Sequence, residues 1–89
     1  MFDYVWQYHP GGNVDHIEQD HDISIDLWER IFEHAYSIGA PATPEKDDPT
    51  AFIYQVRYKR VRYRLVFRPK GRKIKPLTII IYPISGMLE

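Results

Sequence analysis

The spacing of apolar residues changes from helical to strand-like half-way along the chain, and this change most constrains the fold. In the first half, apolar residues lie three, four, seven and ten positions after Trp28, as on one face of an α-helix. Ser24 stands where an N-cap is expected, and Gly39 where a left-handed residue would end the helix. The sequence therefore predicts a helix between them that buries Trp28, Ile31, Phe32, Ala35 and Ile38.

From Phe52 to Phe67 the apolar residues alternate with polar ones, which is the period of a strand with one buried face. The apolar positions are even-numbered up to Tyr58 and odd-numbered from Val61. A two-residue turn at Lys59-Arg60 would keep both sets on the same face of a hairpin. Neither residue is a typical type I′ former, so a bulge or a wider loop is the alternative.

The remaining segments complete the order β-α-α-β-β-β. Phe2–Tyr8 reads as a first strand, and Asn13 is placed to cap a short helix. Ala40–Pro49 reads as an exposed connector, and Pro69–Pro76 as a turn. Leu77–Ile84 is apolar at nearly every position, which predicts a strand covered on both faces. We predict an α+β fold, a small antiparallel sheet with two helices packed on one face.

The length of 89 residues suits a single domain, here residues 1–89. The chain has no cysteine, which excludes disulfides, thiolate zinc sites and a cysteine nucleophile. No basic segment followed by an apolar run opens the chain, and no apolar stretch is long enough for a membrane span. We therefore expect a soluble, cytoplasmic protein.

Charge is divided between the two halves of the chain. Residues 1–50 carry 11 acidic against 2 basic side chains, a formal charge of −9, and residues 51–89 carry 10 basic against 1 acidic, a charge of +9. Such a cationic cluster attracts polyanions, and arginine binds phosphate through two parallel hydrogen bonds. Protection of a sheet edge is the alternative explanation. The predicted nucleic-acid-binding residues are Arg57, Lys59, Arg60, Arg62, Arg64, Arg68, Lys70, Arg72, Lys73 and Lys75.

Two short motifs point to a known family. They are an Asn followed by His-Ile, and a His-x-Ile-Ser turn that leads into the helix: Asn13-Val14-Asp15-His16-Ile17 and His21-Asp22-Ile23-Ser24. With the Phe2-Asp3-Tyr4 start and the late Ile81-Tyr82-Pro83-Ile84-Ser85 segment, they resemble BrnT-like toxins, small members of the RelE-type toxin superfamily. The chain departs from the family pattern where Asp20 replaces a Lys and Asp22 replaces a Gly.

The resemblance implies the toxin of a type II toxin–antitoxin pair, an endoribonuclease that a co-encoded antitoxin neutralises by covering its basic surface. RelE-type enzymes cut RNA without metal and use the substrate 2′-hydroxyl as nucleophile. This chemistry asks for a base near the 2′-oxygen, a cation on the phosphorane and an acid on the leaving 5′-oxygen. RNA and a cognate antitoxin are the expected partners, and no metal or other cofactor is expected.

The candidate catalytic residues are His21, Arg62, Arg64 and Tyr82. His21 matches the family motif and carries the side chain best suited to acid–base work near neutral pH, although its ring would also serve to fix the turn. The two arginines stand mid-strand for phosphate contacts, with a solvated arginine ladder as the alternative. Tyr82 is a candidate phenolic acid or a packing residue, and for His16 we favour a structural role.

Two further functions fit the same charges. One is a non-catalytic module that binds nucleic acid or an acidic protein, and the other is a homo-oligomer in which opposite halves of two copies meet. Tyr58 and Tyr63 flank the basic residues and would either stack on unpaired bases or belong to the core. A metal site is disfavoured because the spacing of the nearby nitrogen and oxygen ligands matches no zinc signature. These ligands are His16, Asp20, His21, Asp22 and Asp26.

Overall fold

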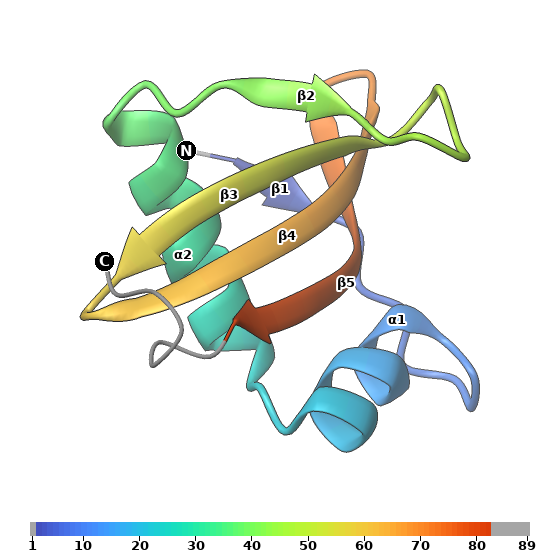
Figure 1. Ribbon diagram of the computed structural model, residues 1–89. Helices are drawn as coiled ribbons and strands as arrows, with labels where there is room; N and C mark the ends of the chain where they lie inside the picture. The colour runs from blue at the N-terminus through green and yellow to red at the C-terminus, as the bar shows by residue number, and fades with distance from the viewer. Residues whose placement is uncertain (1, 83–89) are drawn as a thin grey trace.

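A five-stranded mixed sheet and two helical regions form the α+β fold of the computed structural model, which describes residues 2–82 apart from the side chain of residue 20 (Figure 1). The strand order across the sheet is β1-β5-β4-β3-β2. The elements are β1 (Asp3–Tyr4), α1 (Asn13–Asp15), the π-helix η1 (His16–Asp20), α2 (Ile25–Ser37), β2 (Ala42–Pro44), β3 (Phe52–Tyr58), β4 (Val61–Lys70) and β5 (Lys73–Tyr82).

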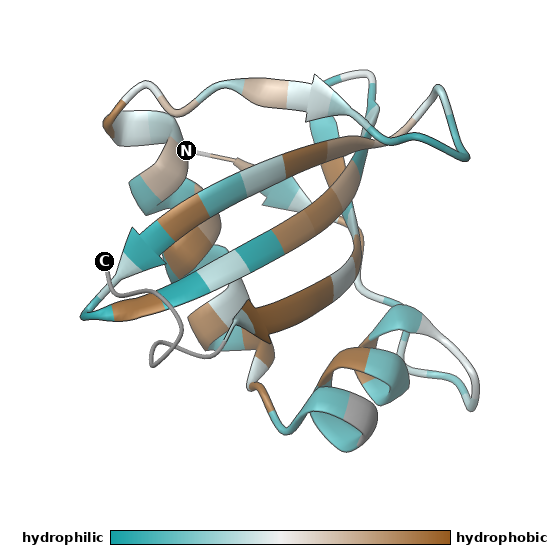
Figure 2. Ribbon diagram, in the orientation of Figure 1, coloured by the Kyte–Doolittle hydropathy of each residue, from teal (hydrophilic) through white to brown (hydrophobic). Residues whose placement is uncertain are grey.

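The helix α2 agrees with the sequence prediction. The Ser24 hydroxyl accepts a hydrogen bond from the Leu27 amide at 3.1 Å, and Gly39 follows the helix with φ of 71°. The rings of Phe32 and Phe67 meet edge to face at 4.9 Å, which packs α2 against the sheet. Four of the five predicted stripe residues are buried, and Ile38, beyond the last helical turn, is 59% exposed. Figure 2 shows apolar segments of α2 behind the sheet.

The sheet is mixed, so the expected purely antiparallel arrangement is wrong. β1 pairs with β5 in parallel, with Asp3 opposite Lys73 and Tyr4 opposite Ile74. A parallel partner comes from a distant part of the chain, and local alternation carries no information about it. The expected connector also contains β2, which pairs with β3; its Pro44 is tolerated because an edge strand has no neighbour on one side.

The hairpin between β3 and β4 has the predicted two-residue turn. Lys59 and Arg60 have φ of 50° and 72°, the signs that a type I′ turn requires at both positions. Arg57 therefore lies opposite Arg62. The buried residues Tyr54, Val56, Tyr63, Leu65 and Phe67 share the face that packs on α2.

Asn13 does not cap the first helix, contrary to the sequence prediction. The N-cap is Gly12. A larger residue would clash here, because its Cβ would lie 2.5 Å from the Gln7 carbonyl oxygen. Asn13 is instead buried, accepting from the Gln7 amide at 2.7 Å and donating to the carbonyls of Val5 and Pro76 at 2.9 and 2.8 Å. A buried amide side chain thus fastens the N-terminal segment to β5.

β5 is not covered on both faces as predicted. Ile80 and Ile81 are 39% and 47% exposed, while Ile79, which precedes them, is fully buried. β1 reaches β5 only at Lys73 and Ile74, and α2 covers only one face of the sheet. Residues 83 and 84 of the predicted strand lie outside the described residues. Within residues 2–82, no helix is long and apolar enough to cross a bilayer.

Candidate nucleic-acid interface

Three arginines project from the sheet face that lies opposite α2, and we call them the arginine face. Arg57 comes from β3, and Arg62 and Arg64 from β4. Alternation places them outward because their neighbours Val56, Tyr63 and Leu65 are buried. Arg57 and Arg62 are exposed and Arg64 is half-buried. No described helix or strand covers this face, which is turned toward the viewer in Figure 1.

Like charges stand directly opposite one another along the hairpins. The register pairs Arg57 with Arg62, Arg68 with Lys75 and Lys70 with Lys73. Such cross-strand pairs are destabilising. Within residues 2–82, no carboxylate lies at ion-pair distance from any residue of the arginine face. The arginine face therefore holds positive charge without a described carboxylate partner, which a bound anion would neutralise.

A hollow of about 360 Å³ opens beside these arginines. Its lining includes Gln55, Arg57, Arg62 and Tyr82. Tyr82 lies opposite Arg62 in the register, and the Arg64 guanidinium carbon lies 5.7 Å from the centre of its ring. In the described part of the chain the Arg64 Nε atom is buried without a hydrogen-bond partner. The hollow thus offers cations and an aromatic ring, the groups that bind a phosphate and an unpaired base.

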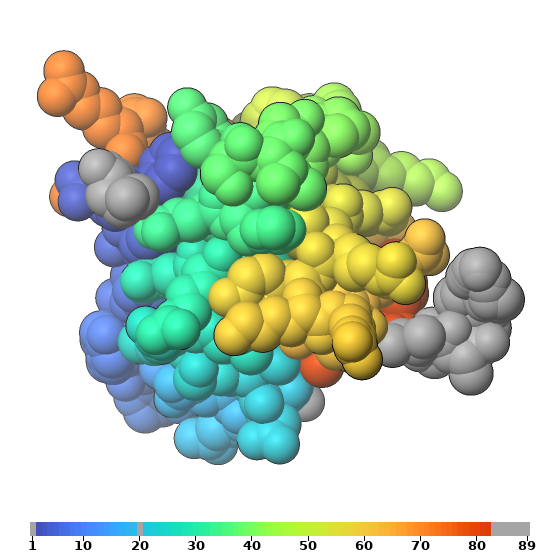
Figure 3. Space-filling view, turned by 90° about the vertical axis from the view of Figure 1, so that its left-hand side faces the viewer, coloured from blue at the N-terminus to red at the C-terminus, as the bar shows by residue number. Residues whose placement is uncertain are grey.

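The ten predicted basic residues do not form one continuous platform. The bulge in β4–β5 at Val66/Phe67 separates them into two groups of five. The near group is Arg57, Lys59, Arg60, Arg62 and Arg64, and the far group is Arg68, Lys70, Arg72, Lys73 and Lys75. In Figure 3 the orange β4–β5 tip projects at the upper left, apart from the yellow β3–β4 tip. The hollow belongs to the near group.

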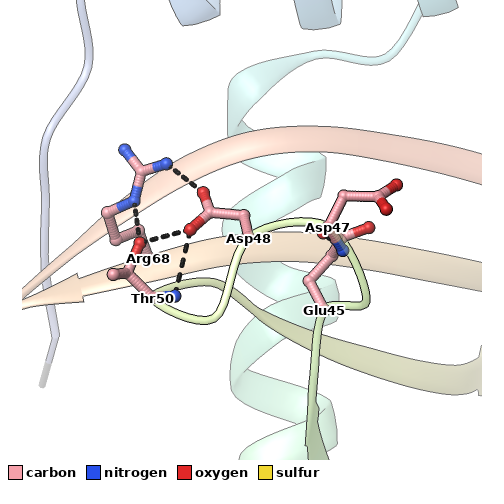
Figure 4. Close-up of polar contacts among 5 residues, drawn as sticks. All are labelled: Glu45, Asp47, Asp48, Thr50 and Arg68. Atoms are coloured by element: carbon pink, nitrogen blue, oxygen red, sulfur yellow. Dashed lines mark hydrogen bonds and ion pairs between the residues drawn. The ribbon is translucent and has the colours of Figure 1, made fainter.

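Arg68 of the far group has a structural partner (Figure 4). Its guanidinium bonds the Asp48 carboxylate and, at 3.0 Å, the Thr50 hydroxyl. The Thr50 hydroxyl and amide donate to Asp48 at 2.6 and 3.0 Å. The hydrogen bonds from Thr50 and Arg68 lower the pKa of Asp48 from its usual 3.8 to about 2. Arg68 therefore secures the loop between β2 and β3.

The two motif histidines meet at a threonine of β5, and we call His16, His21 and Thr78 the histidine–threonine cluster. Their Nε2 atoms lie 2.9 Å and 3.2 Å from the Thr78 hydroxyl oxygen. The two rings stand edge to face with centroids 4.9 Å apart. The His21 ring thus contacts a side-chain hydroxyl of a distant strand. The sequence patterns did not indicate Thr78 as a site residue, because nothing but an outward position in β5 distinguishes it.

The cluster lies next to the arginine face. Thr78 pairs with Val66 and Ile80 pairs with Arg64, so Thr78 and Arg64 are diagonal neighbours on the outward face. Diagonal neighbours lie about 7–8 Å apart, within reach of long side chains. The exposed Ile80 lies directly opposite Arg64 and two residues from Thr78, while the Arg64 guanidinium lies by Tyr82, on the other side of Ile80. The structure thus brings together the predicted residues Arg62, Arg64 and Tyr82, whereas His21 lies by Thr78, four residues from Tyr82 along β5.

The two flanking tyrosines are not equivalent. Tyr63 is 8% exposed in the core, and burial raises the pKa of its phenol. Tyr58 is half-buried beside the ring of His34 at 5.3 Å and below the Lys59 ammonium at 5.5 Å. Tyr63 is thus a core residue, and Tyr82 is the ring that lies beside the arginines.

Acidic residues of α2 make hydrogen bonds on the α2 side of the sheet, away from the arginine face. Glu33 accepts from the Tyr4 hydroxyl at 2.8 Å, and Glu29 accepts from the Trp6 indole at 2.6 Å. Burial and the bond to Glu33 raise the pKa of Tyr4 well above its usual range. The negative half of the chain therefore also has a structural role.

Among residues 2–82, no group of three or more His, Asp or Glu side chains is arranged to hold a metal ion. No family model, curated protein or solved structure matches the chain.

Proposed function

We propose that the protein is a metal-independent endoribonuclease, the toxin of a type II toxin–antitoxin pair, and that RNA lies on the arginine face. One observation carries the proposal: the sheet places Arg57 opposite Arg62, no carboxylate of the described residues lies at ion-pair distance from either, and no described helix or strand covers that face. An arrangement that disfavours the isolated fold is reasonable where a polyanion binds and neutralises it. The resemblance of the motifs to BrnT-like toxins supports the same reading.

The four candidate catalytic residues would divide the chemistry among them. Arg62 and Arg64 would bind the phosphate and stabilise the charge of the phosphorane. Tyr82 would stack on a base beside the cut, and His21 would transfer a proton. The 2′-hydroxyl attacks phosphorus and the 5′-oxygen leaves, which yields a 2′,3′-cyclic phosphate.

The test uses purified protein, a long unstructured RNA and excess EDTA. Wild type should give fragments that end in 2′,3′-cyclic phosphate, and the double variant Arg62→Ala/Arg64→Ala should lose them. The matched control is Arg72→Ala/Lys73→Ala, which removes the same charge from the far group and should keep most of the activity. Equal loss in both variants would mean that overall charge, and not the arginine face, is what the RNA requires.

A non-catalytic binding module is the second candidate. Ile80 is exposed opposite Arg64 on the outward face, a mixture of apolar and basic groups that suits an acidic protein such as an antitoxin. In the same assay this candidate predicts intact RNA. RNA that is bound but not cut would indicate a nucleic-acid module, and RNA that is neither bound nor cut would indicate a protein partner.

A further inference from the structure

The hollow beside the arginines has two chemically different sides. Gln55 of β3 borders it on one side and Tyr82 of β5 on the other, and β4 with Arg62 runs between these strands. The pair Val56–Tyr63 also borders the hollow, and both side chains of this pair belong to the core. The outward face therefore has no side chain between Gln55 and its diagonal neighbour Arg62, and the hollow opens there.

The distance between the two sides suits one flat ring system. Because β4 separates β3 from β5, the strands that carry Gln55 and Tyr82 lie two strand spacings, about 10 Å, apart. The volume of about 360 Å³ falls at the lower end of the range for small-ligand sites. An aromatic ring at the border of a basic groove is the usual platform for an unpaired base. The hollow therefore has room for one base against the Tyr82 ring.

The Gln55 amide is available to such a base. Gln55 is exposed, and within residues 2–82 its side-chain amide makes no hydrogen bond. Its neighbours Tyr54 and Val56 supply the buried positions of β3, so Gln55 adds nothing to the core. An amide presents an acceptor next to two donors, whereas the guanidinium groups of Arg57 and Arg62 only donate. The border of the hollow thus combines one neutral donor–acceptor group with cations.

We infer that the hollow binds one unpaired adenine, stacked on Tyr82 and recognised by the Gln55 amide, and that Gln55 sets the base preference of the RNA site. Adenine presents the acceptor N7 beside the N6 amino donor, and a glutamine amide bonds both at once. Guanine presents two acceptors on the same edge, which suit an arginine better than an amide. A purine also covers more of the tyrosine ring than a pyrimidine does. The inference rests on the proposed function and adds the base that this site selects.

Base recognition and phosphate binding fall to different side chains. Tyr82 pairs with Arg62 in the register, so a nucleotide stacked on Tyr82 has its backbone within reach of that guanidinium. Phosphate contacts position a nucleic acid without carrying sequence information, whereas contacts to base edges carry it. Loss of Gln55 should therefore change which base is preferred and leave the salt dependence of binding unchanged.

The test measures binding of short oligothymidines, which lack the 2′-hydroxyl and stay intact. One central thymine is replaced by adenine, guanine or 7-deazaadenine, which lacks N7 but stacks as adenine does. Wild type should bind the adenine oligonucleotide about fivefold to tenfold more tightly than the other two, the low end for a bidentate base contact because water reaches this site. Gln55→Ala should bind all three alike. Tyr82→Leu should weaken binding of all three at least about fivefold, and Tyr82→Phe should bind as wild type does.

The matched control is Gln19→Ala, which removes an exposed glutamine of η1 and should keep the adenine preference. An adenine preference that persists in Gln55→Ala, or a wild type that prefers guanine, would overturn the role of Gln55 and leave nucleic-acid binding standing. A wild type that prefers adenine but leaves RNA uncut would overturn the ribonuclease and support the adenine site. A wild type that binds none of the oligonucleotides would overturn both.

Discussion

Replacement of Arg57 by threonine should stabilise the protein while it weakens RNA binding. Arg57 and Arg62 face each other across β3 and β4, and both are exposed without a described carboxylate partner. A like-charge pair in this position costs a few tenths of a kcal/mol to about 1 kcal/mol, and long side chains can diverge, so we take about 0.5 kcal/mol. For a domain of this size that corresponds to a rise in Tm of about 2–4 °C. Threonine also favours the strand.

The matched control is Gln55→Thr, which lies on the same strand and face but removes no charge. Thermal unfolding followed by circular dichroism should place Arg57→Thr above Gln55→Thr at low salt, and the gap should close near 1 M salt because repulsion is screened. The salt dependence of single-stranded RNA binding should weaken by about 0.7 in logarithmic slope for the one lost phosphate contact. If Arg57→Thr melts below Gln55→Thr at low salt, the arginines do not repel one another, and the main support for an anion-binding face is lost.

Three further predictions concern the fold around the site. Asn13→Ala leaves three backbone groups without their buried partner and should lower the free energy of unfolding by about 2–4 kcal/mol in urea titrations; an unchanged midpoint would refute the fastening role. Asp22 has φ of 57°, so Asp22→Gly should raise the free energy of unfolding and Asp22→Ala should lower it, by about 1 kcal/mol each; the reverse order in urea titrations would show that the Asp22 side chain matters more than its backbone. The pKa of Asp48 is lowered from its usual 3.8 to about 2. The hydrogen bonds to its carboxylate therefore stabilise the fold above pH 3.8, and this stabilisation is lost as the pH falls toward 2. In this range urea midpoints of wild type should approach those of Asp48→Asn, and a constant difference would contradict the assignment.

Local sequence patterns were sufficient wherever one segment determines its own structure. The Ser24 cap, the Gly39 stop and the turn at Lys59-Arg60 follow from spacing and backbone preference alone, and the structure confirms all three. The pairing of β1 with β5 and the exposure of Ile80 depend on which segments lie beside β5. Alternation within a strand does not contain that information.

The candidate site shows the same division. The outward positions of Arg57, Arg62 and Arg64 could be read from the two-residue period, and the split of the basic residues at the bulge could not. For His16 a structural role was favoured because His21 matches the family motif better, and the sequence does not show that the two rings meet. Only the π-turn and the distant strand β5 bring the two rings to one hydroxyl.

The departure of Asp22 from the BrnT-like pattern is conservative in backbone terms. The family pattern has a glycine at this position, and here Asp22 adopts φ of 57°, which glycine accepts most readily and aspartate better than most residues. Asp22 is the left-handed residue that follows His21 at the end of η1. A strained non-glycine residue and an irregular helix on either side of one histidine are difficult to explain as features of a merely structural turn, because an ordinary α-turn with glycine would connect the same elements at lower cost. Their combination therefore favours selection for the position of the imidazoles rather than for the stability of the helix.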